Sequence, residues 1–215
     1  MRNGKIQCAL LAASLLGGCN LVISEQPWFA ADAAAPRLKQ GLWVNLDPNG
    51  CTFDSAKPVD DWPECAEPMI VRGDSYVVRD ENSENGNKWE ELAHVVAAGT
   101  PLVDQIEWRR KDKAAYLYMG LAATARDADG AITEVKRWLV QCGPLDPPGK
   151  DKQVEAGPPR MVTSRPFAGL TLDASNNGTA ASAEALRGAA GLSEALASED
   201  GNSPVMGHWV REGSR

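Results

Sequence analysis

Apolar and polar residues alternate over much of the chain, which is the pattern of strands with one buried and one exposed face. GLWVNLD at 41–47 predicts a strand closed by the turn-forming DPNG, and residues 68–80 predict a hairpin whose two-residue loop is Gly73-Asp74. The segment 94–98 is consistent with a strand or with a short helix from Trp89. Further strands are expected at 103–108, 114–125, 131–142, 167–173 and, as a final edge strand, 206–210.

The pattern changes near the C-terminus. Residues 143–159 contain five Pro and three Gly and predict an extended surface connection. Residues 180–198 predict a helix with Ser182 as its cap and an apolar face of Leu186, Ala189, Leu192 and Leu196. The expected fold class is mainly β, or α+β: an antiparallel meander or small barrel-like sheet with one C-terminal helix.

The first residues follow a different pattern. Arg2 and Lys5 precede the apolar run 6–16, which is far shorter than the roughly 20 residues of a membrane-spanning helix and fits a cleaved signal peptide. The run ends in Leu16-Gly17-Gly18-Cys19, which resembles the lipobox of bacterial lipoproteins. The resemblance implies that a signal peptide, 1–18, is removed, Cys8 with it, and that the Cys19 thiol carries a diacylglycerol. The alternative is an ordinary secretory signal cut at Ala33-Ala34-Ala35.

The lipoprotein resemblance also suggests a location and a domain plan. Asn20, at the second mature position, implies an outer-membrane address facing the periplasm, with the inner membrane or surface exposure as alternatives. Residues 19–40 are expected to form the lipidated N-terminus and a tether, on which Trp28 and Phe29 either meet the bilayer interface or dock on the domain. Residues 41–215 are expected to form a single β-rich envelope domain.

Net charge narrows the choice of partners. The chain has 22 basic and 29 acidic residues, and loss of Arg2 and Lys5 with the signal leaves 20 against 29, a net charge of -9. An acidic surface argues against nucleic acid and anionic headgroups, and it suits a basic protein partner. The expected membrane contact is therefore the N-terminal lipid alone, and the pattern indicates no oligomeric state.

Candidate chemistry is sparse. Only two histidines, His94 and His208, are present, and the cysteine spacing does not match zinc sites, so no cofactor or metal is predicted. The acidic loop containing Asp80, Glu81 and Glu84 does not match calcium-ligand spacing, and Arg72-Gly73-Asp74 is explained by its turn. The densest acidic group lies beside Trp62 and is the one candidate for glycan hydrolysis: Asp60, Asp61 and Glu64.

The cysteines predict one disulfide. Three remain after processing besides Cys19, and the compartment beyond the inner membrane is oxidising. We expect Cys51 to pair with Cys65, which leaves Cys142 as a buried free thiol, while a pairing of Cys142 with either of the others stays open.

The body resembles only small envelope proteins of unknown function whose sheets open with a Gly-Leu-Trp strand, here 41–43. The sequence therefore predicts a lipid-anchored envelope protein, not an enzyme, that acts by binding or structural support. One alternative is an inhibitor or assembly factor for a basic envelope enzyme, of the lysozyme-inhibitor lipoprotein type. The other is a carboxylate-based cell-wall glycan hydrolase.

Overall fold

A computed structural model of the chain describes residues 20–46, 51–63, 65–80, 88–110, 113–146, 163–174, 176–199 and 204–213. Within these ranges the protein is mostly β-structure, with one α-helix near the C-terminus, α1 (Ala183–Glu199). The strands of the main sheet are β1 (Ile23–Ser24), β2 (Gly41–Leu46), β3 (Ala66–Arg72), β4 (Ser75–Arg79), β5 (Trp89–Ala97), β6 (Leu102–Arg110), β7 (Lys113–Arg126), β8 (Ile132–Leu139) and β11 (Val205–Arg211).

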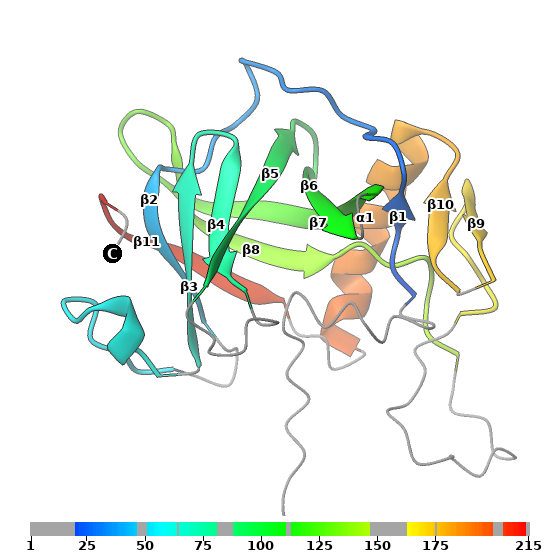
Figure 1. Ribbon diagram of the computed structural model, residues 1–215. Coiled ribbons are helices and arrows are strands. Elements are labelled where there is room, and N and C mark those ends of the chain that lie inside the picture. Colours follow the sequence, from blue (N-terminus) through cyan, green and yellow to red (C-terminus); the bar gives the residue numbers. More distant parts are fainter. Residues whose placement is uncertain are drawn as a thin grey trace, which may run out of the picture.

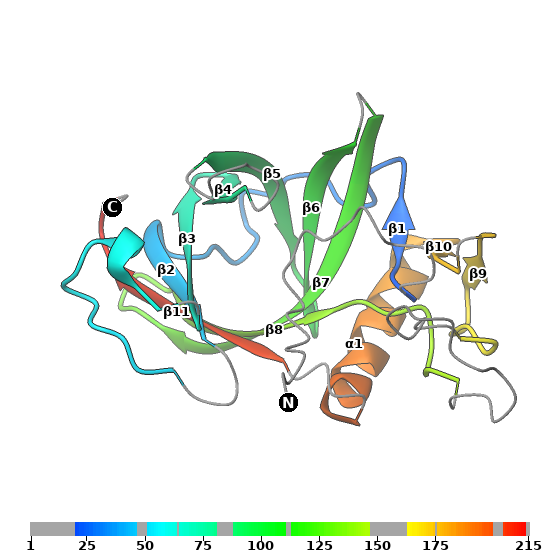
Figure 2. The same cartoon turned by 60° about the horizontal axis from the view of Figure 1, so that its bottom comes forward.

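Eight of these strands close into an antiparallel barrel-like sheet (Figures 1 and 2). The chain runs as a meander from β2 to β8, and β11 then lies between β8 and β2. β7 closes the barrel because one of its edges pairs with β6 and the other pairs with β8. The predicted fold class is thus confirmed: mainly β, barrel-like, with a C-terminal helix.

The last strand corrects a prediction. Residues 206–210 were expected at a sheet edge, but β11 pairs with β2 on one side and with β8 on the other. Its alternating side chains gave no sign of a second partner, because pairing on both edges uses only backbone groups. β11 is therefore an interior strand that joins β8 to β2.

The ambiguous segment near Trp89 is a strand. β5 pairs with β4 and with β6, so its backbone groups are satisfied by neighbours on both edges. The predicted hairpin at 68–80 is present as β3 and β4, and Gly73 in its loop has φ 58°, a value that favours glycine. Of the predicted connection 143–159, residues from 147 onward lie outside the described part of the chain.

The barrel interior is filled by side chains. Its apolar residues include Trp43, Met69, Met119 and Leu121, each at most 4% exposed. An eight-stranded barrel is just wide enough for such side chains to fill it. The interior is therefore a packed core, and it also contains the polar residues described below.

Two further cores lie outside the barrel wall. One packs α1, β1 and β10 (Gly178–Ala180), which pairs with β9 (Leu170–Leu172), against the outer face of the barrel through residues such as Tyr118 and Leu186. The other packs the segment 51–63, which contains the short 3-10 helix η2 (Val59–Asp61), against β2, β3 and β4. These two layers lie on opposite sides of the barrel in Figures 1 and 2.

The helix predicted at 180–198 is present at Ala183–Glu199 with the predicted cap, but its buried face is shifted. The Ser182 hydroxyl accepts a hydrogen bond from the Ala185 amide at 3.1 Å, as an N-cap does. Leu192 is 52% exposed, whereas the buried stripe consists of Leu186, Ala189, Ala190, Ser193 and Ala197. Small residues bring the helix close to the sheet, so that the Trp138 indole on β8 donates to the Ala190 carbonyl at 2.8 Å.

Gly120 on β7 makes room for this contact. A Cβ at residue 120 would lie 2.2 Å from the Trp138 ring, closer than real Cβ contacts allow. The pair Gly120 and Trp138 is directly opposite in the β7–β8 ladder. Glycine is thus required here for close approach of the indole rather than for an unusual backbone angle.

Candidate functional site

The segment that follows Cys19 packs against the outside of the barrel. The Asn20 side chain is completely buried, and its amide donates to the Gly143 carbonyl at 2.7 Å. The Cys142 amide donates to the Asn20 carbonyl at 2.9 Å, and the Gly178 amide donates to the Leu21 carbonyl at 2.8 Å. Asn20 has φ 54°, a left-handed conformation that asparagine tolerates better than most residues.

The next residues continue the same attachment. β1 pairs with β7 through Ile23 with Leu117 and Ser24 with Tyr116. The Ser24 hydroxyl also lies 2.5 Å from the hydroxyl of Tyr118, whose pKa burial raises to about 12. β1 occupies the edge of β7 that β8 leaves free, because β8 pairs only with residues 119–126.

Residues 28 and 29 are fixed by Gln105. The Gln105 side-chain oxygen accepts from the amides of Trp28 and Phe29 at 2.7 and 3.0 Å, and its nitrogen donates to the Phe29 carbonyl at 3.0 Å. The Phe29 ring packs edge-on against Tyr118. The two aromatic residues thus dock on the domain, which was one of the two alternatives expected from the sequence.

The expected tether over 19–40 is therefore wrong for the residues that the structure describes. Val22 is completely buried and Leu38 is 5% exposed, and the backbone of residues 37 and 39 bonds to Ile132. The sequence of this segment lacks strand periodicity because it supplies single strands and bridges to existing edges rather than a strand pair of its own. Cys19 itself lies outside the described residues.

A second group of interest is buried inside the barrel. We refer to Tyr76, His94, Asp104 and Arg137 as the Asp104 cluster. The Tyr76 hydroxyl donates to one Asp104 carboxylate oxygen at 2.5 Å, and His94 Nδ1 lies 3.0 Å from the other. The Tyr76 and His94 rings are stacked with centroids 3.7 Å apart. Burial, followed by the charge of Asp104, raises the pKa of Tyr76 well above its ordinary value, so that its hydroxyl stays a donor.

Arg137 supplies the positive charge of the cluster. Its side chain is 2% exposed, and its Nη2 lies 3.6 Å from Asp104. Its guanidinium also contacts two weak acceptors, the sulfur atoms of Met69 at 3.4 Å and Met119 at 3.7 Å, and lies 5.3 Å from the Tyr76 ring centroid. Its Nη1 is 3.5 Å from the Asn45 side-chain oxygen, so the closest full negative charge is that of Asp104.

Glu67 lies beyond Asn45. The Asn45 amide donates to the Glu67 carboxylate at 3.5 Å. Burial raises the pKa of Glu67, and the hydrogen bond from Asn45 and the charge of Arg137 only partly oppose that rise. Glu67 thus adds a second carboxylate to the surroundings of Arg137, and its ionisation costs free energy.

The cluster has the orienting half of an acid–base catalyst but lacks a nucleophile. An Asp–His pair can orient an imidazole for proton transfer when the other ring nitrogen faces a Ser or Cys. The Nε2 of His94 has no hydrogen-bond partner in the described part of the chain. The cluster is buried inside a filled barrel and joins side chains of four strands: β4, β5, β6 and β8.

The acidic residues proposed from the sequence lie elsewhere, on the segment outside β2 and β3. Asp60 is paired with Arg79 at 3.1 Å, and its side chain is 75% exposed. Trp62 packs against Phe53 with ring centroids 4.7 Å apart. Asp61 is exposed, and Glu64 lies outside the described residues. Trp62 thus belongs to the core beneath this segment, and Asp60 forms a surface ion pair.

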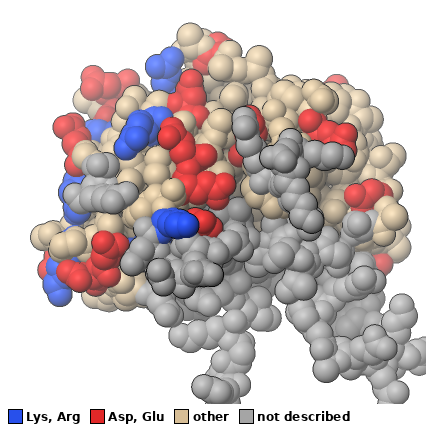
Figure 3. Space-filling model, in the orientation of Figure 1, with Lys and Arg blue, Asp and Glu red and all other residues tan. Residues whose placement is uncertain are grey.

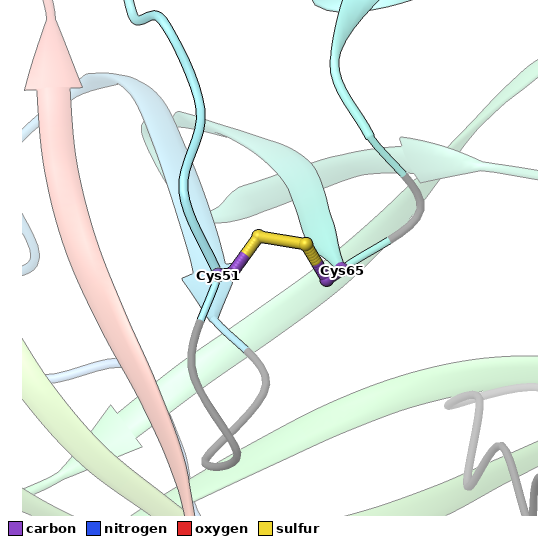
Figure 4. The surroundings of a disulfide bond; sticks show 2 residues. All are labelled: Cys51 and Cys65. Atoms are coloured by element: carbon purple, nitrogen blue, oxygen red, sulfur yellow. A yellow bond between two sulfur atoms is a disulfide. The ribbon is translucent and has the colours of Figure 1, made fainter.

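The predicted disulfide is confirmed. Cys51 and Cys65 are bonded, with Cα atoms 5.6 Å apart (Figure 4). Cys142 is a buried free thiol in the core between the barrel wall and α1, and burial raises its pKa to about 12. In the ranges that the structure covers, no group of His, Cys, Asp and Glu side chains is arranged to hold a metal ion.

Comparisons with protein-family models, with curated proteins and with solved structures found no match. Among the described residues, no helix has the length and apolar character needed to cross a membrane.

Proposed function

We propose that this chain is a lipid-anchored protein of the bacterial envelope, held through Cys19, that acts by binding or structural support rather than by catalysis. The pattern of residues 2–19 motivates the anchor, together with its resemblance to a lipobox. The observation that carries the proposal is the burial of Asn20, Leu21, Val22 and Phe29, which favours a cut directly before Cys19 over the alternative cut after Ala35.

The cost of the alternative cut follows from burial. It would remove Val22 and Phe29 from the core that also contains Tyr118 and α1. Burying an apolar side chain of this size contributes about 1.5–3 kcal/mol, and net stability is only about 5–15 kcal/mol. A protein that began after Ala35 would lose a large part of that margin, whereas a protein that begins at Cys19 retains every one of these contacts.

The disulfide gives independent support for export. Disulfides persist in oxidising compartments such as the periplasm and are rare in the cytosol. The bond between Cys51 and Cys65 closes the segment that covers β2 and β3, which has one short 3-10 helix and otherwise irregular backbone. The filled barrel interior supports a role for the outer surface, because side chains occupy the space in which a barrel of this size holds a ligand.

Metabolic labelling with palmitate tests the proposal. Wild-type protein should incorporate label and partition into detergent with the membranes, and Cys19→Ser should take up none and remain uncut. Cys8→Ser is the matched control, because this cysteine lies within the segment that is removed, and it should label like wild type. Unlabelled wild-type protein whose N-terminus maps after Ala35 would contradict the anchor.

The surface charge favours one more specific candidate, an inhibitor or assembly factor for a basic envelope enzyme. Figure 3 shows Asp and Glu side chains across the described part of one face. On its right-hand side, over β1, β9 and β10, the described residues in view include acidic side chains but no Lys or Arg. A complex steered by these charges should weaken steeply with salt in a pull-down from envelope extract, and binding that is insensitive to salt would rule this candidate out.

A further inference from the structure

The burial of Asn20 fixes where the lipid leaves the protein. Consecutive Cα atoms are about 3.8 Å apart, so Cys19 is adjacent in the chain to a residue that is completely buried on the outside of the barrel. A free tether of sixteen residues, 20–35, would reach roughly 55 Å at full extension. Because residues that follow Cys19 are attached to the folded body, they cannot act as such a tether. The body is therefore held at the membrane surface.

The same contacts identify the side of the molecule that surrounds the attachment point. Asn20 bonds to Gly143, and the neighbouring Cys142 carbonyl accepts from the Phe167 amide at 2.7 Å. Gly143 also packs against the backbone of Arg165. We call Asn20, Gly143 and residues 163–167 the anchor face; within it the side chains of Ser164 and Arg165 are exposed.

We propose that the anchor face docks on the lipid surface in which the acyl chains of Cys19 are inserted, so that the barrel has one fixed orientation on the membrane. This inference rests on the proposed function. The negative net charge of the chain gives no overall attraction to anionic lipid, so docking of the anchor face depends on the lipid attached to Cys19 rather than on lipid charge. The orientation should therefore be the same on vesicles of neutral and of anionic composition.

The fold also shows which end points away from the lipid. β1 pairs with β7 at residues 116 and 117, and β7 then continues to the turn at 127–130. Ten residues of strand cover about 33 Å, so this turn lies far along β7 from the anchor. Asp129, exposed in the turn, is a suitable distal reference position.

Site-specific fluorescence tests the orientation. Full-length lipidated protein with Ser164→Cys or Asp129→Cys is labelled with a polar fluorophore and reconstituted into phosphatidylethanolamine/phosphatidylglycerol or phosphatidylcholine vesicles that contain headgroup-spin-labelled lipid. Cys142 should not react, because it is buried and its pKa is raised to about 12. We expect the Ser164→Cys label to be quenched at least about threefold more strongly than the Asp129→Cys label in both vesicle types.

A linker variant provides the control. Eight residues that begin with Asn and continue with Gly and Ser, inserted between Cys19 and Asn20, preserve the second mature residue and should remove the difference in quenching. Equal quenching at both positions in lipidated protein without the linker would overturn the orientation alone. Protein that carries no palmitate would overturn the proposed function, and this inference with it.

Discussion

Asp104→Asn tests whether the buried cluster stabilises the barrel. The carboxylate accepts from Tyr76 at 2.5 Å, contacts His94 Nδ1 at 3.0 Å and faces the Arg137 guanidinium at 3.6 Å. The asparagine side chain has nearly the same volume as aspartate but no charge. Its NH2 group places a hydrogen-bond donor against one of the groups that the carboxylate contacted. Breaking a buried pair by removal of one partner costs about 3–5 kcal/mol, because the remaining charge is buried without compensation. That loss is a large part of a typical stability of about 5–15 kcal/mol.

Urea unfolding of the mature protein, followed by tryptophan fluorescence, measures this loss. Asp60→Asn is the matched control: it also pairs with an arginine, Arg79 at 3.1 Å, but at the surface, where such pairs contribute about 0.2–1 kcal/mol. In a double-mutant cycle with Arg137→Met, the loss for Asp104→Asn should shrink, since the uncompensated charge is gone. A loss below about 1 kcal/mol for Asp104→Asn, or additive losses in the cycle, would refute this reasoning.

Three further predictions concern other parts of the molecule. Because the pKa of Glu67 is raised in the folded state, its ionisation opposes folding, and wild-type stability falls as pH rises from the unfolded pKa near 4.5 through the folded pKa. Glu67→Gln should therefore be more stable than wild type at pH 8 but not at pH 4. A stability difference that does not depend on pH would contradict this. In mature protein a maleimide should react with no thiol under native conditions, with Cys142 alone in denaturant, and with Cys51 and Cys65 only after reduction; a linked peptide that contains Cys142 would contradict the pairing. Alanine variants in the acidic group should change unfolding free energy by no more than about 0.5 kcal/mol and leave the envelope phenotype intact, whereas loss of a measurable hydrolytic activity would support the glycan hydrolase. These variants are Asp60→Ala, Asp61→Ala and Glu64→Ala.

Strand periodicity predicted most of the barrel, since each long strand has one face toward the interior. The β7–β8 hairpin and the β3–β4 hairpin lie where alternation and turn residues placed them. Closure was harder to predict, because the pairing of β11 with both β2 and β8 depends on long-range backbone contacts that leave no local signal.

The Asp104 cluster was missed, although its sequence signal is present. His94 lies between Leu92 and Val96 in the inward phase of β5, and Asp104 lies between Leu102 and Ile106 on β6. Arg137 likewise interrupts an inward apolar phase on β8. A polar residue among the inward-facing apolar positions of a strand indicates a buried polar partner. The identity of that partner depends on how the strands pair across the barrel.

The attachment of residues 20–24 was missed for a different reason. This segment pairs with β7 through the two-residue strand β1 and forms isolated bridges from Leu21 to Gln141 and from Val22 to Gly178. Asn20 is buried and bonds to Gly143, which lies 123 positions away. Composition and periodicity describe local preference, and they contain no information about such contacts. The disulfide was predictable because oxidising conditions and a short separation of 14 residues both favour it.

The intact mass of the mature protein tests the central claim most directly. Protein extracted from membranes without reduction is measured before and after alkaline removal of ester-linked acyl chains. The lipid-anchored account predicts a chain that begins at Cys19, carries a diacylglycerol on that cysteine and loses ester-linked acyl mass on treatment. A mature chain that begins after Ala35, or an unmodified Cys19, would contradict it.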